Sequence, residues 1–241
     1  DRVLGGGLIP GSVVLLGGAP GVGKSTLVLA IGAALAESGA SVLLATGEES
    51  RGQVALRAGR IGAQSADLLI AIESRIGPLS ELIRSRAYPV VVIDSIQTVT
   101  GSSGSGGAGT AGLVRDTAAQ LIQAAKESGV ALVLIGHITK DGSIAGPKSL
   151  EHMVDVVLSL DGDPLRNLRF LRGTKNRFGS VNEIGVFEMT GRGLQQVVDP
   201  SAHLAGVHAT SVAGSVLFPA LDGRRSLLVE IQALAVPTRA A

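Results

Sequence analysis

The sequence predicts an α/β domain with a central, mostly parallel β-sheet flanked by helices and a C-terminal antiparallel meander. Up to residue 160, short apolar runs alternate with segments of helical periodicity, whereas later apolar runs follow one another without helices. Parallel strands covered by helices on both faces are typically continuous apolar runs. The predicted strands are residues 13–16, 41–46, 67–72, 89–94, 130–135 and 154–160, then 168–172, 184–189 and 194–198 in the meander.

Helices are expected between these strands. Apolar residues recur at helical spacing from Lys24 onwards, and Gly39 marks the expected end of that helix. Pro78 fits the opening of another helix, because proline lacks the N–H that a first helical turn leaves unpaired. The other predicted helices cover residues 54–61, 78–87 and 113–128, with a short helical turn at 150–153.

The composition limits the classes of function. The chain has 241 residues, 45% of them hydrophobic, which is enough for one α/β domain and a fragment. It has no cysteine, so disulfides and thiolate metal sites are excluded. We expect a cytoplasmic protein that does not contact a membrane, because no apolar run approaches the roughly 20 residues of a span. A net charge of +1, with one Tyr, four Phe and no Trp, argues against a broad nucleic-acid surface, so any such contact should be local.

The first predicted strand runs into a loop that fits a phosphate-binding motif. Within VVLLGGAPGVGKST, residues 13–26, four positions match G-x-x-x-x-G-K-[ST]. The backbone N–H groups of such a loop bind phosphates at a helix N-terminus, and β-carbons at its tight positions would obstruct the turn. We expect Lys24 to reach the β- and γ-phosphates and Ser25 to bind Mg²⁺. The residues expected to hold the nucleotide are Gly18, Ala19, Pro20, Gly21, Val22, Gly23, Lys24, Ser25 and Thr26; the alternative is an ordinary glycine-rich turn.

Acidic residues follow two other predicted strands. Glu48 and Glu49 come after the strand at 41–46, and Asp94 ends the strand PVVVID at 89–94. Ligands of open parallel sheets bind at the carboxyl ends of strands, so these acids should lie near the phosphate-binding loop. We interpret Asp94 as a Walker B acid that holds Mg²⁺, and Glu48 as the carboxylate that polarises the attacking water. The alternative is a solvated helix start, which we favour for Glu49.

His137 follows the strand at 130–135, where a polar side chain could sense the γ-phosphate, although a lone histidine is more often structural.

Residues 100–112, TGSSGSGGAGTAG, and residues 139–148 form rim loops that could grip a nucleic-acid backbone, and the alternative is a connector without a partner. The first loop has no Lys or Arg before Arg115, whereas Lys140 and Lys148 flank the second. These three cations are the DNA-binding candidates.

Two cations, Lys175 and Arg177, lie in KNRFG at 175–179, between two strands of the meander. They could form a solvated hairpin tip. They could instead form a finger that enters a neighbouring subunit's active site and stabilises transferred charge. Spacing alone favours the hairpin tip.

Several segments together resemble the bacterial RadA/Sms DNA repair proteins, which are RecA-like P-loop ATPases. The resemblance covers residues 1–199, and KNRFG combined with the phosphate-binding loop is its specific part. The segments are DRVLGGGLIPGSVVLLGGAPGVGKST, GEES, VVVIDSIQ, GHITKDGSIAGPKSLEHMVDVVL and KNRFG. The resemblance implies a hexameric ring related to DnaB-type replicative helicases, which uses ATP, binds single-stranded and branched DNA, and drives branch migration alongside the RecA recombinase.

Residue by residue, the resemblance assigns Lys24 and Ser25 to the P-loop pair, Asp94 to Walker B and Glu48 to the catalytic glutamate. It assigns Lys175 and Arg177 to the finger, which reverses the preference from spacing. The loops at 100–112 and 139–148 fall where RecA-type proteins carry DNA-binding loops. We therefore expect a RecA-like ATPase domain at 1–199 and, at 200–241, the opening strands of a Lon-protease-like domain. The family's four-cysteine zinc module is absent from this sequence.

These expectations combine into a Mg²⁺-dependent ATPase that couples hydrolysis to movement along DNA in recombinational repair. A nucleotide-gated clamp that loads DNA or RecA without motor activity is the main alternative, and a KaiC-like signalling ATPase is another. A small-molecule kinase should carry an arginine-rich lid over the phosphates, for which the meander offers no candidate. The choice of ATP rather than GTP rests on the resemblance.

Overall fold

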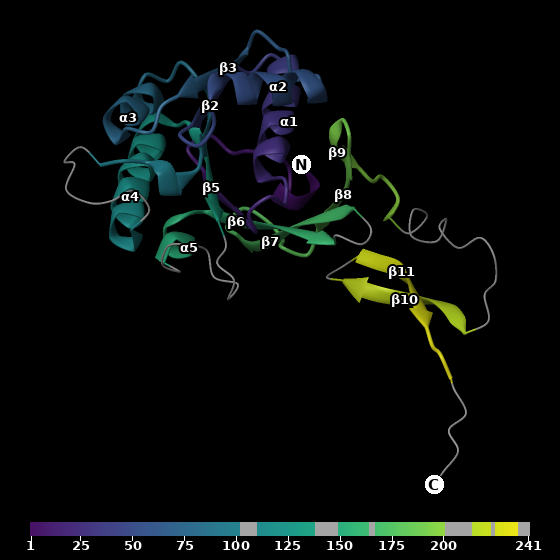
Figure 1. Ribbon diagram of the computed structural model, residues 1–241. Coiled ribbons are helices and arrows are strands. Elements are labelled where there is room, and N and C mark those ends of the chain that lie inside the picture. The colour runs from purple at the N-terminus through teal and green to yellow at the C-terminus, as the bar shows by residue number, and fades with distance from the viewer. Residues whose placement is uncertain (102–109, 138–148, 164–166, 201–213, 223–224, 236–241) are drawn as a thin grey trace.

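A nine-stranded sheet forms the centre of the computed structural model, with strand order β3-β2-β4-β5-β1-β6-β7-β8-β9 (Figure 1). The structure describes residues 1–101, 110–137, 149–163, 167–200, 214–222 and 225–235. The strands that pair in parallel are β1 (Val13–Gly18), β2 (Val42–Thr46), β3 (Leu68–Ile72), β4 (Val90–Asp94), β5 (Ala131–His137) and β6 (Val156–Asp163). The antiparallel strands that follow are β7 (Leu168–Asn176), β8 (Ile184–Thr190) and β9 (Gly193–Gln196). The predicted fold class is confirmed.

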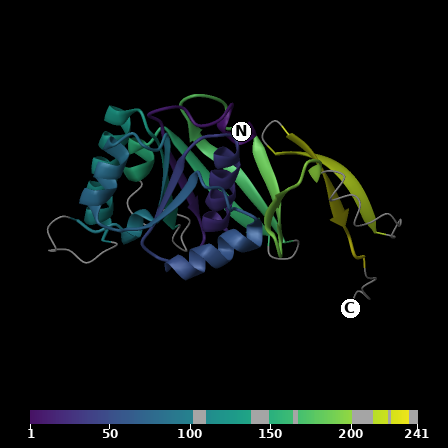
Figure 2. The same ribbon diagram turned by 90° about the horizontal axis from the view of Figure 1, so that it is seen from above.

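Helices cover both faces of the sheet, and each face has its own hydrophobic core (Figure 2). The α-helices are α1 (Lys24–Glu37), α2 (Arg51–Ile61), α3 (Ile76–Arg84), α4 (Ala111–Ser128) and α5 (Ser149–Met153), and the short 3-10 helices are η1 (Arg2–Leu4) and η2 (Ile96–Thr98). Within β1, Val13 and Leu15 pack towards α3 and α4, whereas Val14 and Leu16 pack towards α1. Burial on both faces explains why the parallel strands are continuous apolar runs.

Some elements differ from their predicted bounds. Helix α2 begins at Arg51 rather than residue 54, because Ser50 and Gln53 form a capping box. Helix α3 begins at Ile76, two residues before Pro78. Strand β7 continues to Asn176 instead of ending at residue 172, so Lys175 lies in a strand and not at a hairpin tip. Pairing with β6 accounts for this extension, which a local pattern could not reveal.

Two further strands, β10 (Ser215–Asp222) and β11 (Arg225–Gln232), form a separate antiparallel pair. Both faces of β10 expose apolar side chains, since Val216 is 59% exposed and its neighbour Leu217 47%. Isolated two-stranded sheets are marginally stable in water. The division into an ATPase domain at 1–199 and a second domain opening at 200–241 stays a prediction.

Among the helices in the described ranges, none is long and apolar enough to cross a membrane.

Candidate active site

The glycine-rich loop connects β1 to α1 with little room for side chains. A β-carbon on Gly18 would lie 2.6 Å from the carbonyl oxygen of Leu160. Gly23 has a φ of +114°, and a β-carbon there would lie 2.9 Å from Cε of Met189 on β8. Glycine is needed at both positions, as the motif predicts.

A cavity of about 340 Å³ lies at the carboxyl edge of the sheet beside this loop. Its lining combines the loop with the segment after β2 and the last residue of β5. This volume suits a small ligand, and this edge is where open parallel sheets bind ligands. The lining residues are Pro20, Gly21, Gly23, Lys24, Ser25, Thr26, Glu48, Glu49, Arg57 and His137.

Lys24 is almost fully buried, with 5% of its surface exposed. Its Nζ donates to the carbonyl oxygens of Gly18 at 2.8 Å and Ala19 at 3.0 Å, and lies 3.3 Å from Nδ1 of His137. Burial lowers the pKa of Lys24, although the nearby charges of Asp94 and Glu48 raise it. The ammonium group is therefore held at the start of the loop, where phosphate oxygens could replace its carbonyl partners.

Asp94 ends β4 and is 4% exposed. Burial raises its pKa, the charges of Glu48 and Glu49 act in the same direction, and a hydrogen bond with the Ser25 side chain opposes them. This bond joins the two residues predicted to hold Mg²⁺. Within the described residues, no cluster of three or more His, Cys, Asp or Glu could form a protein-only metal site. Two oxygen ligands suit Mg²⁺, because it usually binds through one or two protein ligands together with substrate phosphates.

Glu48 lines the cavity, and 34% of its side chain is exposed. Its Oε1 accepts a hydrogen bond from the Ser95 hydroxyl and lies 3.1 Å from Nε2 of His137. Burial raises the pKa of Glu48, but the bonds from Ser95 and His137 and the charges of His137 and Lys24 outweigh it, so the pKa lies below its usual value. The side chain is thus an ionised carboxylate at neutral pH, as a general base must be.

Two residues of this site were not expected from the sequence. Ser95 follows Asp94 after a cis peptide bond and orients Glu48. Arg57 comes from α2 and forms a bidentate ion pair with Glu49, in which the Nη1–Oε2 distance is 2.6 Å. Arg57 thus occupies the carboxylate of Glu49, which lies before α2 rather than in its first turn.

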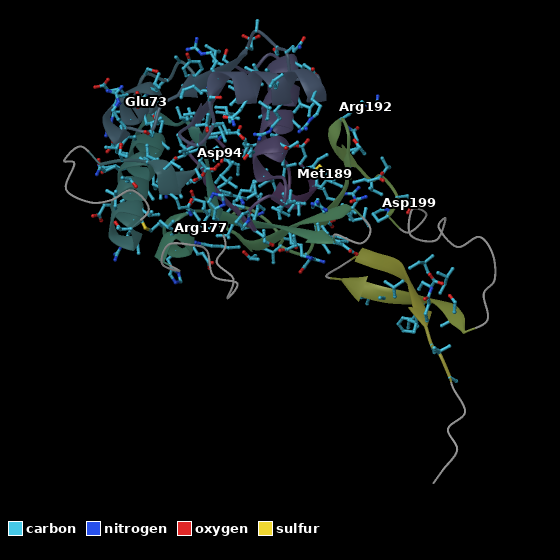
Figure 3. All side chains as sticks on the ribbon, viewed as in Figure 1. Glu73, Asp94, Arg177, Met189, Arg192 and Asp199 are labelled. Atoms are coloured by element: carbon cyan, nitrogen blue, oxygen red, sulfur yellow. The ribbon has the colours of Figure 1, made fainter. Side chains whose placement is uncertain are left out.

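Lys175 and Arg177 lie at the opposite edge of the sheet. Asn176 pairs with Val156, and Val156 pairs with Val14 near the start of β1, whereas the P-loop follows the end of β1. Roughly 13 Å of strand separate Val14 from Gly18. Figure 3 shows Arg177 and Asp94 at separate places in the domain. Neither cation can reach the P-loop of its own chain.

The two cations also have different surroundings. Lys175 donates from Nζ to the carbonyl oxygens of Glu151 and Val154, both at 2.7 Å. Burial lowers its pKa, and so does the charge of Arg177. The Arg177 side chain is 53% exposed and lies 3.1 Å from Oδ1 of Asp155. Arg177 is therefore the more accessible of the two.

Asp155 connects this edge to β1, because its Oδ2 accepts the backbone N–H of Val13 at 3.0 Å. We expect Asp155→Ala to lower the free energy of unfolding by about 2 kcal/mol, since the buried N–H of Val13 loses its acceptor. Urea denaturation would measure this. The control is Asp161→Ala, whose side chain is 53% exposed and 3.8 Å from Arg172, and which should change stability by less than about 0.5 kcal/mol. Equal losses in both variants would contradict the role of Asp155.

Of the DNA-binding candidates, Arg115 lies exposed on α4, one turn after the helix begins. Lys140 and Lys148 lie outside the described residues, as does most of the loop at 100–112.

Comparison with known proteins places the chain in a family. Residues 1–143 match the family described as an AAA domain. The DNA repair protein RadA of Mycobacterium tuberculosis is 48% identical over 236 residues, which cover 97% of this chain and 49% of that protein. RadA of Bacillus subtilis is 46% identical over 238 residues, which cover 99% of this chain and 52% of that protein. The chain thus spans about half the length of these curated relatives.

Solved structures show the same fold at low sequence identity. The RadB recombinase matches with a TM-score of 0.59 and 22% identity over 82% of this chain and 96% of that one. A DnaB-like replicative helicase matches with a TM-score of 0.68 and 15% identity over 78% of this chain and 58% of that one. The chain has a RecA-like fold with a P-loop, belongs to the AAA-domain family, and is a homologue of the bacterial RadA DNA repair proteins.

Proposed function

We propose that this chain is a Mg²⁺-dependent ATPase that acts as a ring-shaped motor on DNA during recombinational repair. One observation carries the proposal: the candidate catalytic groups are divided between two edges of one sheet. Lys24, Glu48 and Asp94 line one edge, whereas Arg177 is exposed at the other. Such a division suits a head-to-tail assembly, in which each subunit completes the site of the next.

In this mechanism, water attacks the γ-phosphorus of ATP, the bond to the β–γ bridging oxygen breaks, and ADP and phosphate leave. Glu48 orients the water and accepts its proton, while Lys24 neutralises the β- and γ-phosphates. Ser25 and Asp94 would hold Mg²⁺, which supplies positive charge to the phosphates when bound. Arg177 of the adjacent subunit would stabilise the charge on the transferred phosphoryl group.

The relatives' description as DNA repair proteins supports the choice of DNA as partner. We propose that a hexameric ring binds single-stranded and branched DNA and promotes branch migration alongside RecA. Arg115, Lys140 and Lys148 remain the candidate DNA contacts. With a net charge of +1, the chain needs local contacts rather than a broad basic surface.

Steady-state ATP hydrolysis at increasing protein concentration, with and without single-stranded DNA, tests this function. We expect the activity per subunit to rise with concentration, because each site needs a neighbour, and to rise again with DNA. Activity that does not respond to DNA would favour the KaiC-like alternative, and activity independent of both DNA and protein concentration would overturn the motor. DNA-stimulated hydrolysis without displacement of a labelled paired strand would indicate the nucleotide-gated clamp.

A further inference from the structure

Arg169 lies beside the P-loop without being part of its motif. It is the second residue of β7 and pairs with Gly162 of β6. Its Nε donates to the carbonyl oxygen of Val22 at 2.9 Å, and its Nη1 donates to the carbonyl oxygen of Leu168 at 2.8 Å. An arginine of the antiparallel strands is thus anchored to the backbone of the nucleotide loop, 147 residues earlier in the chain.

The bond to Val22 fixes the orientation of one peptide group. In a trans peptide, the carbonyl of one residue and the N–H of the next point in opposite directions within one plane. Because the Val22 carbonyl points to Arg169, the N–H of Gly23 points away from Arg169. Gly23 lines the cavity, and its N–H is one of the donors that a P-loop offers to phosphates.

Neighbouring residues keep this arrangement in place. A β-carbon on Gly162 would lie 3.3 Å from Cδ and Nε of Arg169, so glycine leaves the room that this side chain needs. Met189 and Leu194 also lie close to Gly23, since a β-carbon there would be 2.9 Å from Cε of Met189 and 3.4 Å from Cδ1 of Leu194. Because Gly23 has a φ of +114° and no side chain of its own, such external contacts restrict a residue that is otherwise free to rotate.

We infer that Arg169 is a positioning residue for nucleotide binding: it turns the Gly23 N–H towards the phosphates by holding the Val22 carbonyl. This inference rests on the proposed function, since it concerns the same cavity. It separates Arg169 from Arg177: the first acts on its own chain through the P-loop backbone, and the second would act on the neighbouring subunit's phosphates.

A matched pair of variants tests the hydrogen bond. Glutamine places Nε2 the same number of bonds from Cα as Nε of arginine, so Arg169→Gln keeps a donor for the Val22 carbonyl without the charge. Arg169→Met has similar length but no donor. We expect Arg169→Met to weaken the binding of fluorescent ADP and ATP analogues by a similar factor of about ten, and Arg169→Gln to weaken it by less than about threefold. The KM for ATP should rise in Arg169→Met while kcat falls by less than about threefold, because bound ATP still meets Glu48.

One control variant and one second test variant separate this role from a general loss of fold. Arg172→Met removes a cation further along β7 and should leave nucleotide affinity unchanged. Gly162→Ala retains Arg169 but crowds its side chain, and should weaken binding by about two- to fivefold even if Arg169→Met fails to fold. Unchanged affinity in Arg169→Met and Gly162→Ala would overturn the inference, and so would equal losses in Arg169→Gln and Arg169→Met. If the wild-type chain binds no nucleotide, the proposed function itself fails.

Discussion

Replacement of Arg177 by alanine is expected to lower ATP turnover by at least about a thousandfold. The affinity for ATP should stay within about threefold of the wild type, because a finger acts mainly on charge that develops in the transition state. Arg177 can have this effect only on another copy, since the sheet separates it from the P-loop of its own chain. Turnover and equilibrium binding of a fluorescent ATP analogue would be measured on the same preparation.

Mixing two inactive variants tests whether Arg177 acts between subunits. Lys24→Ala subunits lack the phosphate contact but keep Arg177, whereas Arg177→Ala subunits keep an intact cavity. When the two variants are mixed in equal amounts and assemble at random, about one interface in four joins an intact cavity to an intact Arg177. We therefore expect mixing to restore ATP hydrolysis to about one quarter of the wild-type rate. If mixed rings form, as light scattering would show, but no activity returns, the role in trans is wrong.

Glu48→Gln is expected to lower turnover by at least about a hundredfold while ATP remains bound. Glutamine has nearly the same shape and can still accept the hydrogen bond from Ser95, but its amide cannot take a proton from water. Since the pKa of Glu48 lies below its usual value, the wild-type carboxylate is available as a base at neutral pH. Single-turnover hydrolysis of prebound ATP would separate chemistry from binding.

The adjacent glutamate offers the matched control. Glu49 lines the same cavity, but its carboxylate pairs with Arg57. Glu49→Gln should therefore retain hydrolysis within about tenfold of the wild type, since the glutamine oxygen can still accept a hydrogen bond from Arg57. If Glu49→Gln loses as much activity as Glu48→Gln, the assignment of the base to Glu48 fails.

Local patterns predicted the parts of the fold that local chemistry determines. Glycines at 18 and 23 leave room for neighbouring atoms, and the apolar run at 90–93 is buried on both faces of the sheet. Because parallel strands end at one edge, the positions of Glu48 and Asp94 near Lys24 also followed from the sequence.

Contacts between distant segments could not be predicted in this way. Ser95 bonds to a residue 47 positions earlier, and Arg169 bonds across 147 positions. No spacing rule relates such pairs; only the strand order brings them together. Lys175 belongs to the same class, because its two carbonyl partners come from the middle of α5 and from the residue that follows this helix. From the sequence, Lys175 and Arg177 were expected to act together as one finger. In the structure, Arg177 is the more exposed of the two, so the two side chains differ in how well they could reach a neighbouring subunit.

The charges around the cavity have a consequence for how a nucleotide enters. Lys24 and Arg57 face three carboxylates, those of Glu48, Glu49 and Asp94, so the fixed charge of the site is not positive. A bare triphosphate would approach against this field, and low-dielectric walls make such repulsion stronger than in water. We therefore expect the site to favour a triphosphate that carries its own divalent counterion over the free anion.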